Sequence, residues 1–103
     1  MNTEYFIYNE RLGIFLPRLT KEWPAYKGSE QEAILLAWEQ VRGTIPDRIQ
    51  EIDREIEVLQ GKLSEEEDFE TSCSINREIS ERASEINDLW IWYRTTPEKI
   101  EGE

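Results

Sequence analysis

The chain has 103 residues, enough for one domain with a modest core, because a chain of this size buries roughly 60–70 % of its unfolded surface. Four Trp, four Tyr and three Phe argue against a disordered chain. The net charge of −11 disfavours DNA, RNA or an anionic membrane surface as a direct ligand.

Residues 1–26 are compatible with two backbones. The run Tyr5–Tyr8 has high β propensity, yet Tyr5 and Tyr8 also fall on one helical face with Leu12 and Phe15. Gly13 and Pro17 limit either element to a short one. We favour short helical pieces and keep a short β-hairpin as the alternative. With either backbone, the segment supplies six aromatic residues, several of which need burial: Tyr5, Phe6, Tyr8, Phe15, Trp23 and Tyr26.

A first helix is predicted over residues 29–42. Ser29 and Glu32 form a capping-box pattern, and Gly43 is free to take the left-handed conformation that ends a helix. The apolar stripe of this helix consists of Ile34, Ala37, Trp38 and Val41.

The next helix is predicted over about 44–60. Thr44 is its expected N-cap, Pro46 lies in the first turn where no amide donor is needed, and Gly61 ends it. Spacings of four and three residues mark a heptad seam. The seam residues are Ile45, Ile49, Ile52, Ile56, Leu59 and Leu63.

The longest helix is predicted over 64–94. Ser64 with Glu67 forms a capping box, and the short connection from the preceding helix predicts an antiparallel pair. Its expected seam residues are Phe69, Ser72, Asn76, Ile79, Ala83, Ile86, Trp90 and Tyr93. Asn76 could equally lie at the edge of the seam, beside Ile75.

These elements predict a single all-α domain over 1–103. It contains an antiparallel helical hairpin (about 44–60 and 64–94), a third helix (about 29–42), and an aromatic N-terminal segment packed on the long arm. Residues 95–103 follow the last helix and Pro97, and we expect them to form a loose tail. A helical hairpin with a heptad seam is too common to indicate a family.

The connection between the two arms is strongly acidic. Residues 51–70 contain nine acidic and two basic residues, a net charge of −7. The run lacks the alternating ligands and central glycine of a calcium loop, so no metal site is predicted. Ordinary solvated surface is one interpretation and a docking patch for a basic partner is the other. The candidate partner-binding residues are Glu65, Glu66, Glu67, Asp68 and Glu70.

Trp92 is the second candidate for partner binding. On a helix it points roughly 160° away from Trp90, which we place on the seam. An aromatic residue off the seam can serve as an anchor for a partner.

Nothing in the sequence indicates catalysis, a cofactor or a metal. The chain contains no His, and Cys73 lies among acidic residues that disfavour its thiolate. With no internal disulfide, no basic-then-apolar leader and no long apolar run, we expect a cytoplasmic protein that does not associate with membranes.

We therefore expect a small acidic helical protein-binding factor, such as an adaptor, regulator or chaperone-like protein, rather than an enzyme. Its partner is another protein, for which a basic surface would be complementary. The alternatives are a nucleic-acid mimic that blocks a basic DNA-binding protein, and a homo-oligomeric scaffold subunit, for instance a homodimer.

Overall fold

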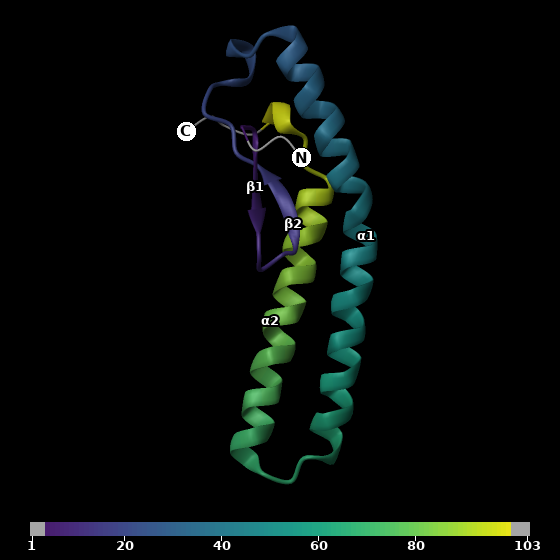
Figure 1. Cartoon of the computed structure of the whole chain (residues 1–103). Helices are drawn as coiled ribbons and strands as arrows, with labels where there is room; N and C mark the ends of the chain where they lie inside the picture. Colours follow the sequence, from purple (N-terminus) through teal and green to yellow (C-terminus); the bar gives the residue numbers. More distant parts are fainter. Residues whose placement is uncertain (1–3, 100–103) are drawn as a thin grey trace.

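The structure is a computed structural model that describes residues 4–99. Within this range, two α-helices pack antiparallel along most of their length, and a two-stranded sheet lies beside them near the chain ends (Figure 1). The molecule is elongated, with extents of 59 × 24 × 20 Å. The elements in chain order are β1 (Phe6–Asn9), β2 (Ile14–Pro17), the 3-10 helix η1 (Trp23–Ala25), α1 (Gly28–Glu65), α2 (Phe69–Tyr93) and the 3-10 helix η2 (Pro97–Lys99).

The prediction of two separate helices at 29–42 and 44–60 is wrong, because α1 is one helix that continues through Gly43 and Gly61. The Thr44 hydroxyl caps nothing and donates instead to the Val41 carbonyl, at 2.7 Å. The buried residues explain the continuity, since their three- and four-residue spacing stays in phase across Gly43. They are Ile34, Trp38, Val41, Ile45, Ile49 and Ile52.

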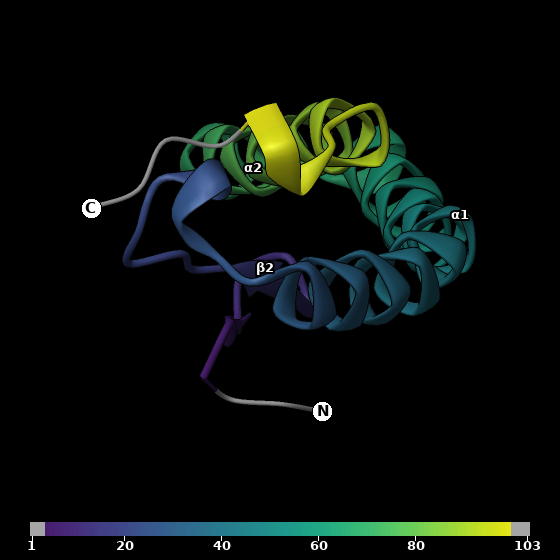
Figure 2. The ribbon, with the colours of Figure 1, turned by 90° about the horizontal axis from the view of Figure 1, so that it is seen from above.

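Pro46 lies inside α1 and removes one amide donor from the helix. Figures 1 and 2 show that α1 is curved, with its concave side toward α2 and the sheet. This curvature lets the first part of α1 follow the hairpin while its second part follows α2. The helix begins at Gly28, where the amide of Lys27 donates to a Glu30 carboxylate oxygen at 3.2 Å, in place of the predicted Ser29 cap.

The α2 face that packs on α1 is rotated from the predicted seam. Ser72, Ile79, Ile86 and Tyr93 are at least partly buried as expected. Asn76, Ala83 and Trp90 are exposed, and their neighbours Ile75, Arg82 and Leu89 take the inward positions. The rotation places an arginine among the inward residues, where its guanidinium group meets carboxylates of both helices.

Residues 6–17 form a β-hairpin, so the favoured prediction of short helical pieces is wrong there and the alternative is confirmed. Phe6 pairs with Pro17 and Asn9 with Ile14, in antiparallel register. The amide of Arg18 donates to the Tyr5 carbonyl at 2.7 Å, so the alternating ladder makes Phe6–Pro17 a non-hydrogen-bonded pair. The missing amide of Pro17 therefore leaves no gap in the ladder.

The hairpin covers both helices rather than the long arm alone. Arg48 Nε on α1 donates to the Leu12 carbonyl at 2.9 Å, and Arg11 pairs with Asp88 on α2 at 2.7 Å. Apolar side chains of the segment and the two helices form one core. Its N-terminal members are Phe6, Leu12, Ile14, Leu19 and Tyr26, and they pack with Ile34, Trp38, Val41, Ile45 and Leu89.

The described part of the predicted loose tail is packed. Trp38 Nε1 donates to the Thr95 carbonyl at 2.8 Å, and Pro97 is fully buried. Residues 100–103 of the predicted tail lie outside the described residues. The fold is thus a helical hairpin joined to a β-hairpin, not the all-α arrangement with a third helix that the sequence predicts.

Candidate functional site

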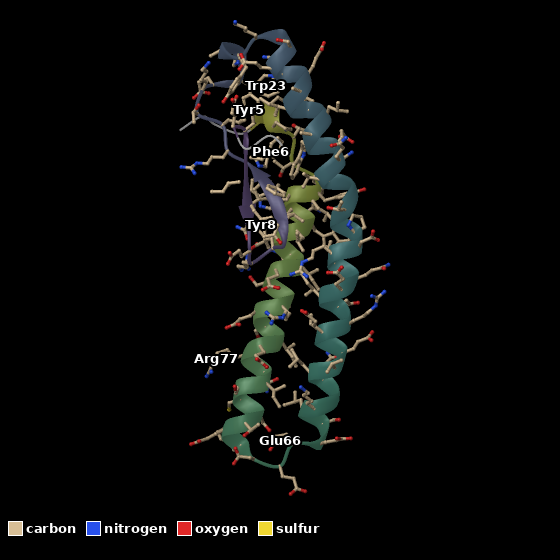
Figure 3. All side chains as sticks on the ribbon, in the orientation of Figure 1. Tyr5, Phe6, Tyr8, Trp23, Glu66 and Arg77 are labelled. Carbon is tan, nitrogen blue, oxygen red and sulfur yellow. The ribbon has the colours of Figure 1, made fainter. Side chains whose placement is uncertain are left out.

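The acidic connection between α1 and α2, residues 65–70, forms the tip of the helical hairpin, far from the aromatic N-terminal residues (Figure 3). Asp68 is the N-cap of α2: its Oδ2 accepts from the amide and the hydroxyl of Thr71, at 2.9 and 2.7 Å. These hydrogen bonds hold the pKa of the Asp68 carboxyl below its usual value. Ser64, the predicted cap, donates instead to the Gly61 carbonyl. Glu66 Oε1 accepts from the Asp68 amide at 3.1 Å.

The other three acidic residues of the tip, Glu65, Glu67 and Glu70, are exposed and form no ion pair with any described residue. Among them lies Phe69, with 79 % of its surface exposed. Its predicted place on the seam is wrong, because as the first residue of α2 it is exposed to solvent instead of buried between the helices. The tip therefore combines a bare aromatic ring with uncompensated carboxylates. The sequence reveals the charge but not the exposure of the ring.

Trp92 does not point away from the core as predicted. It is partly buried and its ring packs edge-on against Trp38, with 6.0 Å between centroids. The exposed aromatic residue on this end of α2 is Trp90, of which 41 % is exposed, and it packs edge-on against Tyr93. A partner-binding role for Trp92 stays a prediction. In the structure, however, the Trp92 side chain is packed on the core.

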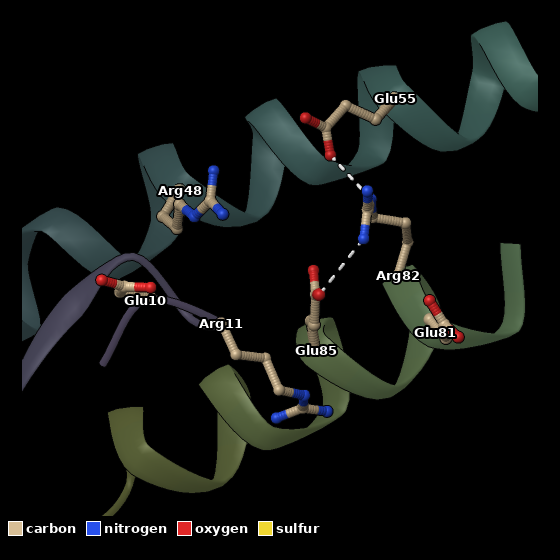
Figure 4. A pocket seen from close by; sticks show the side chains of 7 residues that line it. All are labelled: Glu10, Arg11, Arg48, Glu55, Glu81, Arg82 and Glu85. Atoms are coloured by element: carbon tan, nitrogen blue, oxygen red, sulfur yellow. Dashed lines mark hydrogen bonds and ion pairs between the residues drawn. The ribbon is translucent and has the colours of Figure 1, made fainter. Parts of the chain in front are cut away.

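A polar groove of about 480 Å³ lies where the hairpin loop meets both helices (Figure 4). Arg82 occupies its centre, with Nε 3.1 Å from Glu55 on α1 and Nη1 3.3 Å from Glu85 on α2. The groove is lined by Glu10, Arg11, Arg48, Glu55, Glu81, Arg82 and Glu85.

The chemistry of this polar groove is that of a structural ion-pair network. The buried Glu85 is paired with Arg82, and this pairing offsets the cost of burying its charge. Arg11 and Arg48 join the hairpin loop to α2 and α1 by the contacts given above. Within residues 4–99, no group of His, Cys, Asp and Glu side chains is arranged to hold a metal ion. Cys73 is exposed and free.

A second, apolar groove of about 340 Å³ runs between the hairpin and α1, and we call it the hairpin groove. Sequence reasoning missed it, because it forms only where the β-hairpin crosses α1. Its lining residues are Tyr8, Gly13, Ile14, Phe15, Gln40, Val41 and Thr44.

Comparisons with protein-family models, with curated proteins and with solved structures give no significant match. The functional argument therefore depends on the residues themselves. Over the part of the chain that the structure describes, neither long helix is apolar enough to cross a membrane.

Proposed function

We propose that this chain is a small acidic protein-binding factor, of the adaptor, regulator or chaperone-like kind, with no catalysis of its own. The observation that supports this most directly is the exposed ring of Phe69 among the bare carboxylates of the tip. A partner that fits it presents an apolar pocket surrounded by Lys or Arg side chains.

Within the tip, Phe69 and the carboxylates contribute to binding in different ways. Full burial of a Phe side chain contributes about 1.5–3 kcal/mol, so Phe69 supplies affinity once it enters a pocket. The carboxylates of Glu65, Glu67 and Glu70 attract a basic surface over a longer range and mainly raise the association rate. Phe69 therefore replaces Trp92 as the proposed anchor.

The test is a pull-down from the native cell with the full chain immobilised, compared between wild type and Phe69→Ser. Ile91→Ser is the matched control, because Ile91 is also exposed but lies at the other end of α2. We expect a basic protein, identified by mass spectrometry, to bind wild type and Ile91→Ser but to be lost with Phe69→Ser. Glu67→Lys should weaken capture mainly at low salt.

Two outcomes would contradict the proposal in favour of the alternatives. If excess duplex DNA displaces the captured protein and Phe69→Ser has no effect, the carboxylates act as a nucleic-acid mimic. If no protein is captured and the pure chain sediments as an oligomer that Phe69→Ser dissociates, the tip serves self-assembly.

A further inference from the structure

We propose that the hairpin groove binds a basic amphipathic helix of another protein. This surface is separate from the tip, since Gln40 and Glu65 are roughly 37 Å apart along α1 at 1.5 Å per residue. The proposal therefore does not depend on the function proposed for the tip.

The hairpin groove has the shape and composition of a site for apolar side chains. Its floor includes the buried Ile14 and Val41, and its wall is Tyr8, which is 50 % exposed and packs edge-on against Phe15 with 5.1 Å between centroids. A volume of about 340 Å³ accommodates small groups of apolar side chains.

One exposed apolar side chain on α1, that of Leu36, extends the hairpin groove toward the start of the helix. Leu36 is 65 % exposed and lies one turn before Gln40, which lies one turn before Thr44, so the three share one helix face. Gly43 is on the same side, and a Cβ added there would meet nothing within 4 Å. The stripe from Leu36 to Thr44 is about 12 Å long, matching two to three turns of a partner helix with apolar residues at i, i+4 and i+7.

Charge decides what kind of helix fits. Glu32 precedes the stripe by one turn, Asp47 follows it, and both are exposed and make no ion pair with any described residue. The nearby cations are engaged elsewhere: Arg42 with Glu39 and the Tyr93 carbonyl, and Arg48 with Glu51 and the Leu12 carbonyl. Both ends of the stripe are therefore flanked by a free carboxylate, and a complementary helix carries Lys or Arg beside its apolar face.

A second copy of the chain is a poorer occupant by the same argument. Each copy carries a net charge of −11, and a two-fold interface through this face would bring the free carboxylates of both copies together. A basic helix is instead attracted by the same carboxylates, through its Lys and Arg side chains.

The test uses a synthetic 18-residue peptide of Leu and Lys with its Leu residues on one helical face, titrated into the full chain by fluorescence anisotropy. A peptide of the same composition in scrambled order is the control ligand. We expect Gln40→Lys to weaken binding of the amphipathic peptide roughly tenfold. Gln50→Lys, the same change at an exposed site of α1 outside the groove, should have little effect, as should Phe69→Ser at the tip.

The proposal is overturned if the amphipathic peptide does not bind, or if the scrambled peptide binds equally well. It is also overturned if Gln40→Lys and Gln50→Lys weaken binding equally, because the attraction is then only net charge. If the pure chain sediments as a dimer that Gln40→Lys alone dissociates, a second copy occupies the hairpin groove instead. Loss of peptide binding with Phe69→Ser alone would assign the peptide to the tip.

Discussion

Two glycines of this chain have opposite backbone environments. Gly13 in the hairpin loop has φ of +73°, and a Cβ there would lie 2.6 Å from Arg48 Nε. Arg48 would have to release the Leu12 carbonyl to make room. Gly43 lies in the interior of α1, where a Cβ would meet only open space. Of these two positions, only Gly13 has a backbone conformation that favours glycine.

We therefore predict that Gly43→Ala raises the free energy of unfolding by about 0.5–1 kcal/mol, because alanine loses less backbone entropy than glycine in a helix. Gly13→Ala should lower it by about 1 kcal/mol or more, since alanine is strained at positive φ. Urea denaturation of both variants measures the difference. If Gly43→Ala instead lowered the free energy of unfolding, a contact within the fold would require the absence of a side chain at position 43.

The two tryptophans at the end of α2 differ in a similar way. We predict that Trp92→Ala lowers the free energy of unfolding by about 2–4 kcal/mol, because it removes the ring that packs on Trp38 in the core. Trp90→Ala should cost clearly less, because Trp90 is exposed and has mainly Tyr93 as a ring neighbour. Thermal melts of the two variants measure this order. If Trp90→Ala lowered the melting temperature more than Trp92→Ala, α2 would have the rotation that the sequence predicts.

At the scale of the elements, α2 depends on a titratable cap. The pKa of Asp68 is lowered by the hydrogen bonds from Thr71, so folding favours its charged form. Its contribution to stability is complete above the ordinary value of 3.8 and is lost as pH falls through the lower folded-state pKa.

We predict that wild type melts at a higher temperature than Asp68→Asn at neutral pH, because only the carboxylate interacts favourably with the positive end of α2. Asparagine retains a capping oxygen but does not titrate. The difference in melting temperature should shrink as pH is lowered from about 5 to about 2, while other acidic residues affect both proteins alike. A difference that stays constant over this range would show that the charge of Asp68 does not contribute.

At the scale of the whole molecule, the ion pairs are unevenly distributed. Four arginines, Arg11, Arg42, Arg48 and Arg82, are paired with carboxylates near the hairpin and the middle of the helices. The tip, residues 65–70, has no such pairs among the described residues, although it contains five acidic residues: Glu65, Glu66, Glu67, Asp68 and Glu70. Repulsion between carboxylates therefore opposes closure of the helical hairpin at that end.

We predict that raising sodium chloride from low concentration to about 0.15 M raises the melting temperature, because screening on a length of about 8 Å relieves this repulsion. The double variant Glu67→Lys, Glu70→Lys should show a smaller salt effect, since it removes much of the charge. A melting temperature that falls with salt would indicate that attractive ion pairs dominate the stability.

The whole molecule also separates the two proposed surfaces. The tip and the hairpin groove lie far apart along α1, joined by a continuous helix. If both proposals hold, the chain can hold two partners at once, which is the arrangement that an adaptor needs.

Much of the helical hairpin follows from the sequence alone. The inward residues Ile45, Ile49 and Ile52 and the antiparallel return of the chain depend on periodicity and a short connection. The acidic tip can also be predicted from the sequence, because charged residues can be counted without knowledge of the fold. The unbroken helix could also have been read, since the apolar stripe from Ile34 continues in phase through Gly43 to Leu63.

Only the tertiary structure decided the remaining features. The rotation of α2 puts Arg82 inward because Glu55 and Glu85 meet it there, a pairing that no local pattern contains. The exposure of Phe69 and the burial of Trp92 have the same physical reason. Burial depends on which segments meet in space, whereas the local sequence determines only which apolar side chains each segment carries.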